Sequence, residues 1–213
     1  MRPRGPFRPS SSPRRRRPRP ELALAGLLLS ACATATLPPP AVAMRAAAAV
    51  SWSGSLRVSV SGRDVRGRSR VLMAFRRPDA VRIEIPGPTG ARLVAVALGG
   101  HLTAVLPAEK AFLESGAAAG DLEALLGVAL SPRELMDVLV GVAPAGLRDY
   151  EARWGDRLPR RVEALLADGT RLKATVDEAE TDPDLSEAVF LPPPHPGYRR
   201  IDADEARRLL GGR

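Results

Sequence analysis

The sequence predicts a mostly β protein of the α+β class, in which a helical insertion interrupts nine or ten antiparallel strands. Three observations support this. Apolar and polar side chains alternate after residue 50, glycine-containing turns separate the alternating segments, and helical spacing replaces the alternation near residue 120 before it returns. With 213 residues, 45% of them hydrophobic, the chain can bury the hydrophobic core that such a fold needs.

Six strands are predicted before the insertion. The first three alternate, which is typical of strands with one face in water. The fourth is apolar on both faces, which predicts a central strand covered on each side, and Gly99-Gly100 turns it into the fifth. The six segments are residues 55–62, 68–77, 80–87, 91–100, 101–107 and 110–115.

Two short helices follow. Residues 120–127 place leucines at helical spacing. Residues 131–141 give a stronger signal, because Ser131 as N-cap, Pro132 at the first helical position and Glu134 two positions later form a capping box. Helices at this point are unusual, because a meander of six strands could have closed by itself.

The strand pattern then resumes. Residues 147–154, 160–169 and 170–180 are predicted strands, and Asp168-Gly169 between the last two is typical of a hairpin. A short apolar segment at 188–191 and a final helix at 204–210 complete the series.

The positive charge of the chain belongs to its first residues. Residues 1–31 hold eight arginines and one acid, a net charge of +7, whereas the whole chain has a net charge of +8, so the remaining residues carry +1. Nucleic-acid binding requires a basic face on the folded domain. The sequence therefore predicts no nucleic-acid partner.

The apolar run at 22–31 is too short to span a bilayer, which takes about 20 helical residues, but suits the hydrophobic region of an export signal. Leu29-Ser30-Ala31-Cys32 resembles a bacterial lipobox. A thioether anchor accounts for a lone cysteine better than a disulfide or a metal site; an ordinary signal with a stray cysteine is the alternative. We expect a lipoprotein signal peptide at 1–31 and a lipidated Cys32.

Residues 32–50 are rich in alanine and proline and are expected to form a tether, with the alternative that the alanines at 46–49 begin a helix. The folded domain is expected at 51–213. Ala33 follows the cysteine in place of the aspartate that tends to retain proteobacterial lipoproteins at the inner membrane. By resemblance, the expected location is the periplasmic face of the outer membrane.

The order of these elements resembles the LolA/LolB family of lipoprotein carriers over residues 52–200. The similar segments are RIEIPGPTGARLVAVAL (82–98), GVALSPRELMDVLVGVAP (127–144) and RLPRRVEALLADGTRLKATVDE (157–178). The resemblance implies an incomplete antiparallel barrel whose open mouth is crossed by helices above an apolar cavity. An anchored chain is closer to LolB, whereas the tail at 190–202 is similar to LolA.

This resemblance implies a monomeric, outer-membrane-anchored lipoprotein that receives acylated lipoproteins from a soluble LolA-type carrier, binds their acyl chains and helps insert them. A LolA-like lipoprotein that binds or senses another envelope lipid, and a structural lipoprotein with a filled core, are the alternatives. The inward positions of the predicted strands and helices give the expected lining, although each could equally be a packed core position: Val58, Val60, Met73, Phe75, Ile83, Ile85, Val96, Leu98, Leu135, Met136, Leu139 and Trp154.

The turn Pro88-Thr89-Gly90 corresponds to a LolB connection whose exposed leucine is thought to help put cargo into the membrane. Threonine would bury less apolar area in lipid than leucine. The resemblance marks these three residues as the candidate membrane-insertion loop, and Thr89 weakens the expected insertion.

Other chemistry finds little support in the residues. His101 and His195 are far apart and no HExxH pattern occurs, so no metal site is expected. No GxSxG or P-loop motif is present, and Pro183 in the acidic segment 181–187 spoils a calcium-loop geometry. We therefore expect no enzyme activity and no cofactor.

Overall fold

The structure is a computed structural model that describes residues 38–63 and 66–211. The predicted signal peptide, Cys32 and the first part of the predicted tether lie outside the described residues. Within them, no helix is both long enough and apolar enough to cross a membrane.

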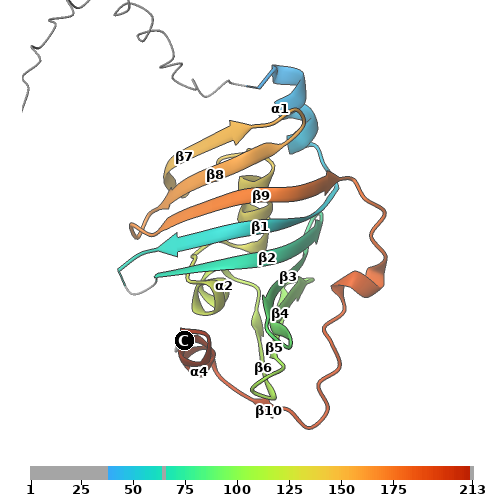
Figure 1. The fold of residues 1–213 in the computed structure, drawn as a ribbon, viewed down its shortest axis with the longest axis vertical. Coiled ribbons are helices and arrows are strands. Elements are labelled where there is room, and N and C mark those ends of the chain that lie inside the picture. Colours follow the sequence, from blue (N-terminus) through green and yellow to red (C-terminus); the bar gives the residue numbers. More distant parts are fainter. Residues whose placement is uncertain (1–37, 64–65, 212–213) are drawn as a thin grey trace, which may run out of the picture. The chain divides into compact units, whose positions relative to one another are not determined.

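The described strands form one ten-stranded sheet in the order β10-β6-β5-β4-β3-β2-β1-β9-β8-β7 (Figure 1). Neighbouring strands are antiparallel except β10, which runs parallel to β6. The end strands β7 and β10 do not pair, so the barrel is incomplete, as predicted. The strands are β1 (Ser51–Ser61), β2 (Arg66–Arg76), β3 (Ala80–Gly87), β4 (Gly90–Leu98), β5 (His101–Leu106), β6 (Ala111–Gly116), β7 (Leu147–Trp154), β8 (Pro159–Leu166), β9 (Arg171–Thr181) and β10 (Arg199–Arg200).

The helices are α1 (Pro40–Ala47), α2 (Ala119–Leu126), α3 (Pro132–Leu139), the 3-10 helix η1 (Glu187–Phe190) and α4 (Ala203–Gly211). The predicted capping box of α3 is confirmed. The Ser131 hydroxyl accepts a hydrogen bond from the Glu134 N–H at 3.3 Å, and the Glu134 carboxylate accepts one from the Ser131 N–H at 2.8 Å. This reciprocal pair satisfies two of the N–H groups that a helix start leaves free.

One segment differs from the sequence prediction, and another gains a defined structure. α1 begins inside the expected tether, and its Ala46, together with Ala49, is buried in the core. The short apolar segment at 188–191, for which the sequence predicts neither a helix nor a strand, contributes to η1 and places Phe190 against the outer face of β3 and β4.

The core lies on both faces of β4. Leu93 and Ala95 belong to the large cluster on the concave face, whereas Val94 and Val96 pack with Phe190 on the outer face. The prediction that this strand is covered on each side is confirmed. η1 thus explains the apolar outer face, and the concave face is left for α2 and α3.

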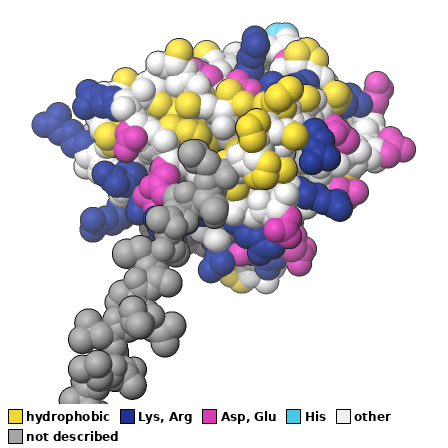
Figure 2. Space-filling view, turned by 90° about the horizontal axis from the view of Figure 1, so that it is seen from above, with side chains coloured by type: hydrophobic (Ala, Val, Ile, Leu, Met, Phe, Trp, Pro, Cys, Tyr) yellow, Lys and Arg dark blue, Asp and Glu magenta, His cyan; other side chains and the backbone are white. Residues whose placement is uncertain are grey.

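The end of the sheet formed by β7 is an open edge. Figure 1 shows α1 beside this end, and Figure 2, seen from that side, shows hydrophobic side chains gathered among charged ones. β7 also carries half-buried apolar side chains such as Tyr150 and Trp154. An open sheet edge with unpaired backbone groups is a place where a further chain can pair.

Candidate functional site

A cavity of about 750 Å³ lies on the concave face of the sheet, between the inner sides of β1, β2, β3 and β9 and the helices α2 and α3. Its buried lining is almost entirely aliphatic. The buried residues that line it are Leu56, Val60, Val71, Met73, Ile83, Leu122, Ala124, Leu125, Val128, Leu130, Val138, Leu139, Thr170, Leu172 and Ala174.

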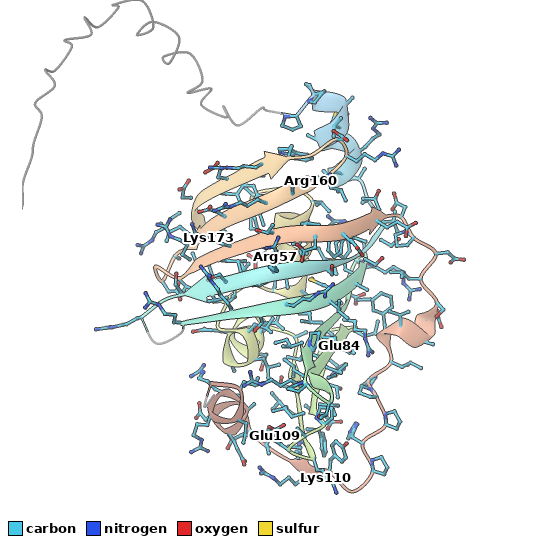
Figure 3. The ribbon with its side chains drawn as sticks, in the orientation of Figure 1. Arg57, Glu84, Glu109, Lys110, Arg160 and Lys173 are labelled. Atoms are coloured by element: carbon cyan, nitrogen blue, oxygen red, sulfur yellow. The ribbon has the colours of Figure 1, made fainter. Side chains whose placement is uncertain are left out.

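Strand alternation makes this surface apolar. Val58 of β1 stands directly opposite Ser69 of β2 and Ala174 of β9, and all three line the cavity. The intervening residues point outward, and Arg57 and Lys173 mark the outer face of the same strands (Figure 3). There Arg57 pairs with Asp177 at 2.8 Å and Lys173 with Glu163 at 2.8 Å. The outer face of these strands therefore carries charged side chains that suit contact with water, whereas the inner face is aliphatic.

The structure places seven of the twelve expected lining residues around this cavity: Val58, Val60, Met73, Ile83, Ile85, Leu135 and Leu139. Strands β1, β2 and β3 and helix α3 bring them together. Their alternation in the sequence was sufficient to find the inner face of these three strands.

Three of the other five do not line the cavity. Phe75 stacks in parallel on Trp52 with ring centroids 5.8 Å apart, and Met136 is fully buried under α3. The indole of Trp154 fills the space beside Gly141, where an added Cβ would come within 2.4 Å of it. Phe75 and Met136 are packed core, the alternative that the sequence left open, and Trp154 is half-buried against that core.

The remaining two, Val96 and Leu98, lie on the other face of β4. Ala95 stands directly opposite Ile83, so the odd-numbered residues of β4 face the concave side. Val96 packs under η1, and Leu98 is 42% exposed. Because β4 is apolar on both faces, its pattern did not indicate which set points inward.

Other lining residues were missed by sequence reasoning. Leu122, Leu125, Val128 and Leu130 come from α2 and the segment after it. The helical spacing of the leucines was visible, but their direction depends on where α2 lies. α2 packs on α4, whereas α3 packs on β8, and Figure 1 shows α4 next to α2.

The exposed lining residues mark the mouth of the cavity. They lie at the ends of the β1–β2 and β8–β9 connections and on α4, on the left in Figure 1. Arg63, Arg66, Asp168 and Arg207 are among them. The cavity is therefore apolar in its depth and charged at its opening.

Two polar contacts hold α3 at the other end. The hydroxyl of the half-buried Tyr150 donates a hydrogen bond to the Val138 carbonyl at 2.8 Å, and burial raises the pKa of this phenol. Arg77 donates to the Asp137 carboxylate, also at 2.8 Å. These contacts fix α3 to β7 and to the β2–β3 connection.

The candidate insertion loop is placed at the tip of the β3–β4 hairpin. Pro88 and Thr89 form the two-residue turn, and both are exposed. This turn carries no large apolar side chain. Among the described residues, the large apolar side chains that are exposed all lie elsewhere: Met44, Val50, Leu72, Leu98 and Leu191.

No protein-family model and no curated protein matches the sequence. Solved structures do match. A LolA superfamily protein from Nitrosomonas europaea is 10% identical, with 74% of this chain and 99% of that one covered and a TM-score of 0.45. An uncharacterised conserved protein from Thermus thermophilus is 12% identical over 75% and 96%, with a TM-score of 0.42. The lipoprotein LppX from Mycobacterium tuberculosis is 13% identical over 68% and 98%, with a TM-score of 0.34. None of the three is similar enough to assign a function.

Proposed function

We propose that this protein is an outer-membrane-anchored lipoprotein that holds the acyl chains of other lipoproteins in its cavity and helps place them in the membrane. One observation carries the proposal: an aliphatic cavity of about 750 Å³ under two helices. Binding pockets for small molecules occupy about 300–1,000 Å³ and are mostly apolar. An occupant with a long apolar chain fits both properties.

The energetics of such an occupant are favourable. Each buried methylene contributes about 0.8 kcal/mol, so about ten of them contribute on the order of 8 kcal/mol before the costs of ordering. The buried part of the described lining carries no charged side chain, and Thr170 is its one polar residue. We propose that the protein acts by binding.

Anchoring through Cys32 is part of the proposal. A chain with Cys32→Ser is expected to leave the membrane fraction and to incorporate no labelled palmitate. The control is a chain that keeps Cys32 and carries only Ser30→Ala, which leaves a small residue in the segment before the cysteine. This control should stay membrane-bound. Sedimentation of the Cys32→Ser chain with membranes would contradict the anchor.

The binding step is tested by closing the cavity. Val58→Trp fills space on the cavity wall, whereas Thr175→Trp puts the same side chain on the outer face of the neighbouring strand. Mass spectrometry of the purified full chain should find acylated peptide or lipid with wild type and with Thr175→Trp, and little with Val58→Trp. Equal occupancy of both variants would place the ligand elsewhere.

One observation favours a second candidate, a LolA-like lipoprotein that binds or senses another envelope lipid without inserting it. The exposed Pro88-Thr89 turn offers little apolar area to a membrane. Depletion separates the two roles. An acceptor that works with a soluble LolA-type carrier predicts lipoproteins stranded in the periplasm or inner membrane, and the second role predicts normal sorting.

A further inference from the structure

The mouth of the cavity is formed by segments that are distant in the sequence. Arg63 and Arg66 flank the β1–β2 connection, Arg92 lies on β4, and Arg207 lies on α4. All four line the same cavity, whose buried part carries no charged side chain. The cations thus stand where an aliphatic interior meets water.

The irregular pairing of β3 and β4 brings one of them to this place. Ile85 stands opposite Leu93 and Pro86 opposite Ala91, which leaves Arg92 without a partner in the ladder. Irregularities of this kind redirect a side chain. Arg92 reaches the cavity and donates a hydrogen bond to the Leu210 carbonyl near the end of α4. It ties α4 to the sheet, so we assign it a structural role.

The described acids near the mouth form no close ion pair with the other three arginines. The Asp168 carboxylate accepts hydrogen bonds from the Thr170 N–H and hydroxyl, both at 2.8 Å, and these bonds lower the pKa of Asp168. The second acid in the lining, Glu123, is half-buried on α2. Among the described residues, Arg63 and Arg66 form no ion pair. Arg207 reaches Asp204 only at 4.0 Å, and both side chains are largely exposed.

We infer that the ligand carries an anionic, phosphate-bearing headgroup beside its acyl chain, and that Arg63, Arg66 and Arg207 bind this headgroup at the mouth. The inference rests on acyl-chain binding in this cavity and deepens the second candidate function, the binding of another envelope lipid, because the acylated cysteine of a lipoprotein bears no phosphate. Guanidinium groups bind phosphate oxygens through paired, charge-assisted hydrogen bonds. With the chain in the aliphatic depth, the headgroup remains at the opening, within reach of cations that come from two sides of it.

The test uses two lipids with the same single acyl chain, anionic lysophosphatidylglycerol and zwitterionic lysophosphatidylcholine. Each displaces the fluorescent probe N-phenylnaphthylamine from the full chain carrying Cys32→Ser. Three exposed charge contacts make the anionic lipid bind about tenfold tighter. The preference falls as salt is raised, because the mouth is exposed.

The triple variant Arg63→Gln, Arg66→Gln, Arg207→Gln is expected to lose this preference and to keep its affinity for the zwitterionic lipid. The matched control is Arg70→Gln, Arg157→Gln, Arg208→Gln, which removes the same charge from exposed residues outside the lining. The control keeps the preference. Urea midpoints and circular dichroism of both triple variants verify that each is folded.

The outcomes are distinguishable. Equal displacement by the two lipids overturns the headgroup inference and leaves acyl-chain binding intact. If the control triple variant also loses the preference for the anionic lipid, the headgroup inference is overturned, because the net charge of the protein and not the arginines of the mouth would then cause the preference. Free glycerophosphate, which has no acyl chain, is a further competitor. If it displaces the probe at the same concentration as the anionic lipid, the anion binds without an acyl chain, and the headgroup inference is overturned. Displacement by neither lipid refutes acyl-chain binding in this cavity, the step that both candidate functions share.

Discussion

Helices α2 and α3 cover the same cavity but are attached to the protein in different ways. α3 has a side-chain cap at Ser131, an ion pair from Asp137 to Arg77, and a carbonyl bonded to the Tyr150 hydroxyl. The N-cap residue of α2 is Ala118, whose side chain has no oxygen, and α2 packs on α4. Among the described residues, no side-chain hydrogen bond or ion pair joins α2 to the sheet.

The difference shows that one helix over the cavity can be held to the sheet by polar contacts while its neighbour is held by apolar packing alone. Local opening needs the least free energy where few contacts are lost. α2 and α4 border the charged mouth of the cavity. α3 instead packs on β8 and is bonded to Tyr150 of β7. We therefore infer that a ligand enters by local unfolding of α2, while α3 stays folded in place.

The largest expected effect comes from truncating the buried side of each helix. Met136→Ala on α3 is expected to lower the free energy of unfolding by about 3 kcal/mol, because it opens a new void in a packed core. Leu125→Ala on α2 is expected to lower it by about 2 kcal/mol, because that side chain already borders the cavity and adds less new void. Urea unfolding of the full chain with Cys32→Ser measures both. A larger loss for Leu125→Ala would reverse the comparison.

A smaller effect is expected where α3 is tied to the β2–β3 connection. Arg77 pairs with Asp137 at 2.8 Å with both side chains about three-quarters buried, and its Nε donates to the Ala49 carbonyl at 3.1 Å. Arg77→Gln is expected to lower the free energy of unfolding by about 1–2 kcal/mol. Arg153→Gln, which breaks the exposed pair with Glu151, is the control and should change it by less than about 0.5 kcal/mol. Equal losses in the urea titrations would show that the Arg77 pair does not fasten α3.

Features with local causes were predictable from the sequence. The start of α3 depends on Ser131, Pro132 and Glu134, which are neighbours in the chain, and the structure contains their capping box. The inner faces of β1, β2 and β3 follow from strict alternation against polar residues. Each of these signals can be read without knowing what the segment packs against.

Features with tertiary causes were not predictable. α1 forms in an alanine-rich and proline-rich segment because Ala46 and Ala49 are buried against the sheet, and composition does not reveal that contact. The inward face of β4 depends on its register with β3. The arginines of the mouth come from three separate parts of the chain, so no spacing in the sequence relates them.

The smallest expected effect tests whether α2 is the helix that moves. Ala118 has φ −78° and ψ 164°, close to the −67° and 161° of Ser131, and its N–H already donates to Asp121 at 3.2 Å. Ala118→Ser supplies the missing cap oxygen and is expected to raise the free energy of unfolding by about 0.5–1 kcal/mol. If α2 opens to admit ligand, stopped-flow uptake of N-phenylnaphthylamine slows about two- to fivefold.

Ser131→Ala is the counterpart on α3. It is expected to lower the free energy of unfolding by about 1 kcal/mol and to leave the uptake rate unchanged, because α3 does not have to move. Faster uptake with Ser131→Ala and an unchanged rate with Ala118→Ser would assign entry to α3. The two substitutions change the same capping interaction at the two helices, so a difference in their kinetic effects identifies the helix that opens, whatever their effects on stability.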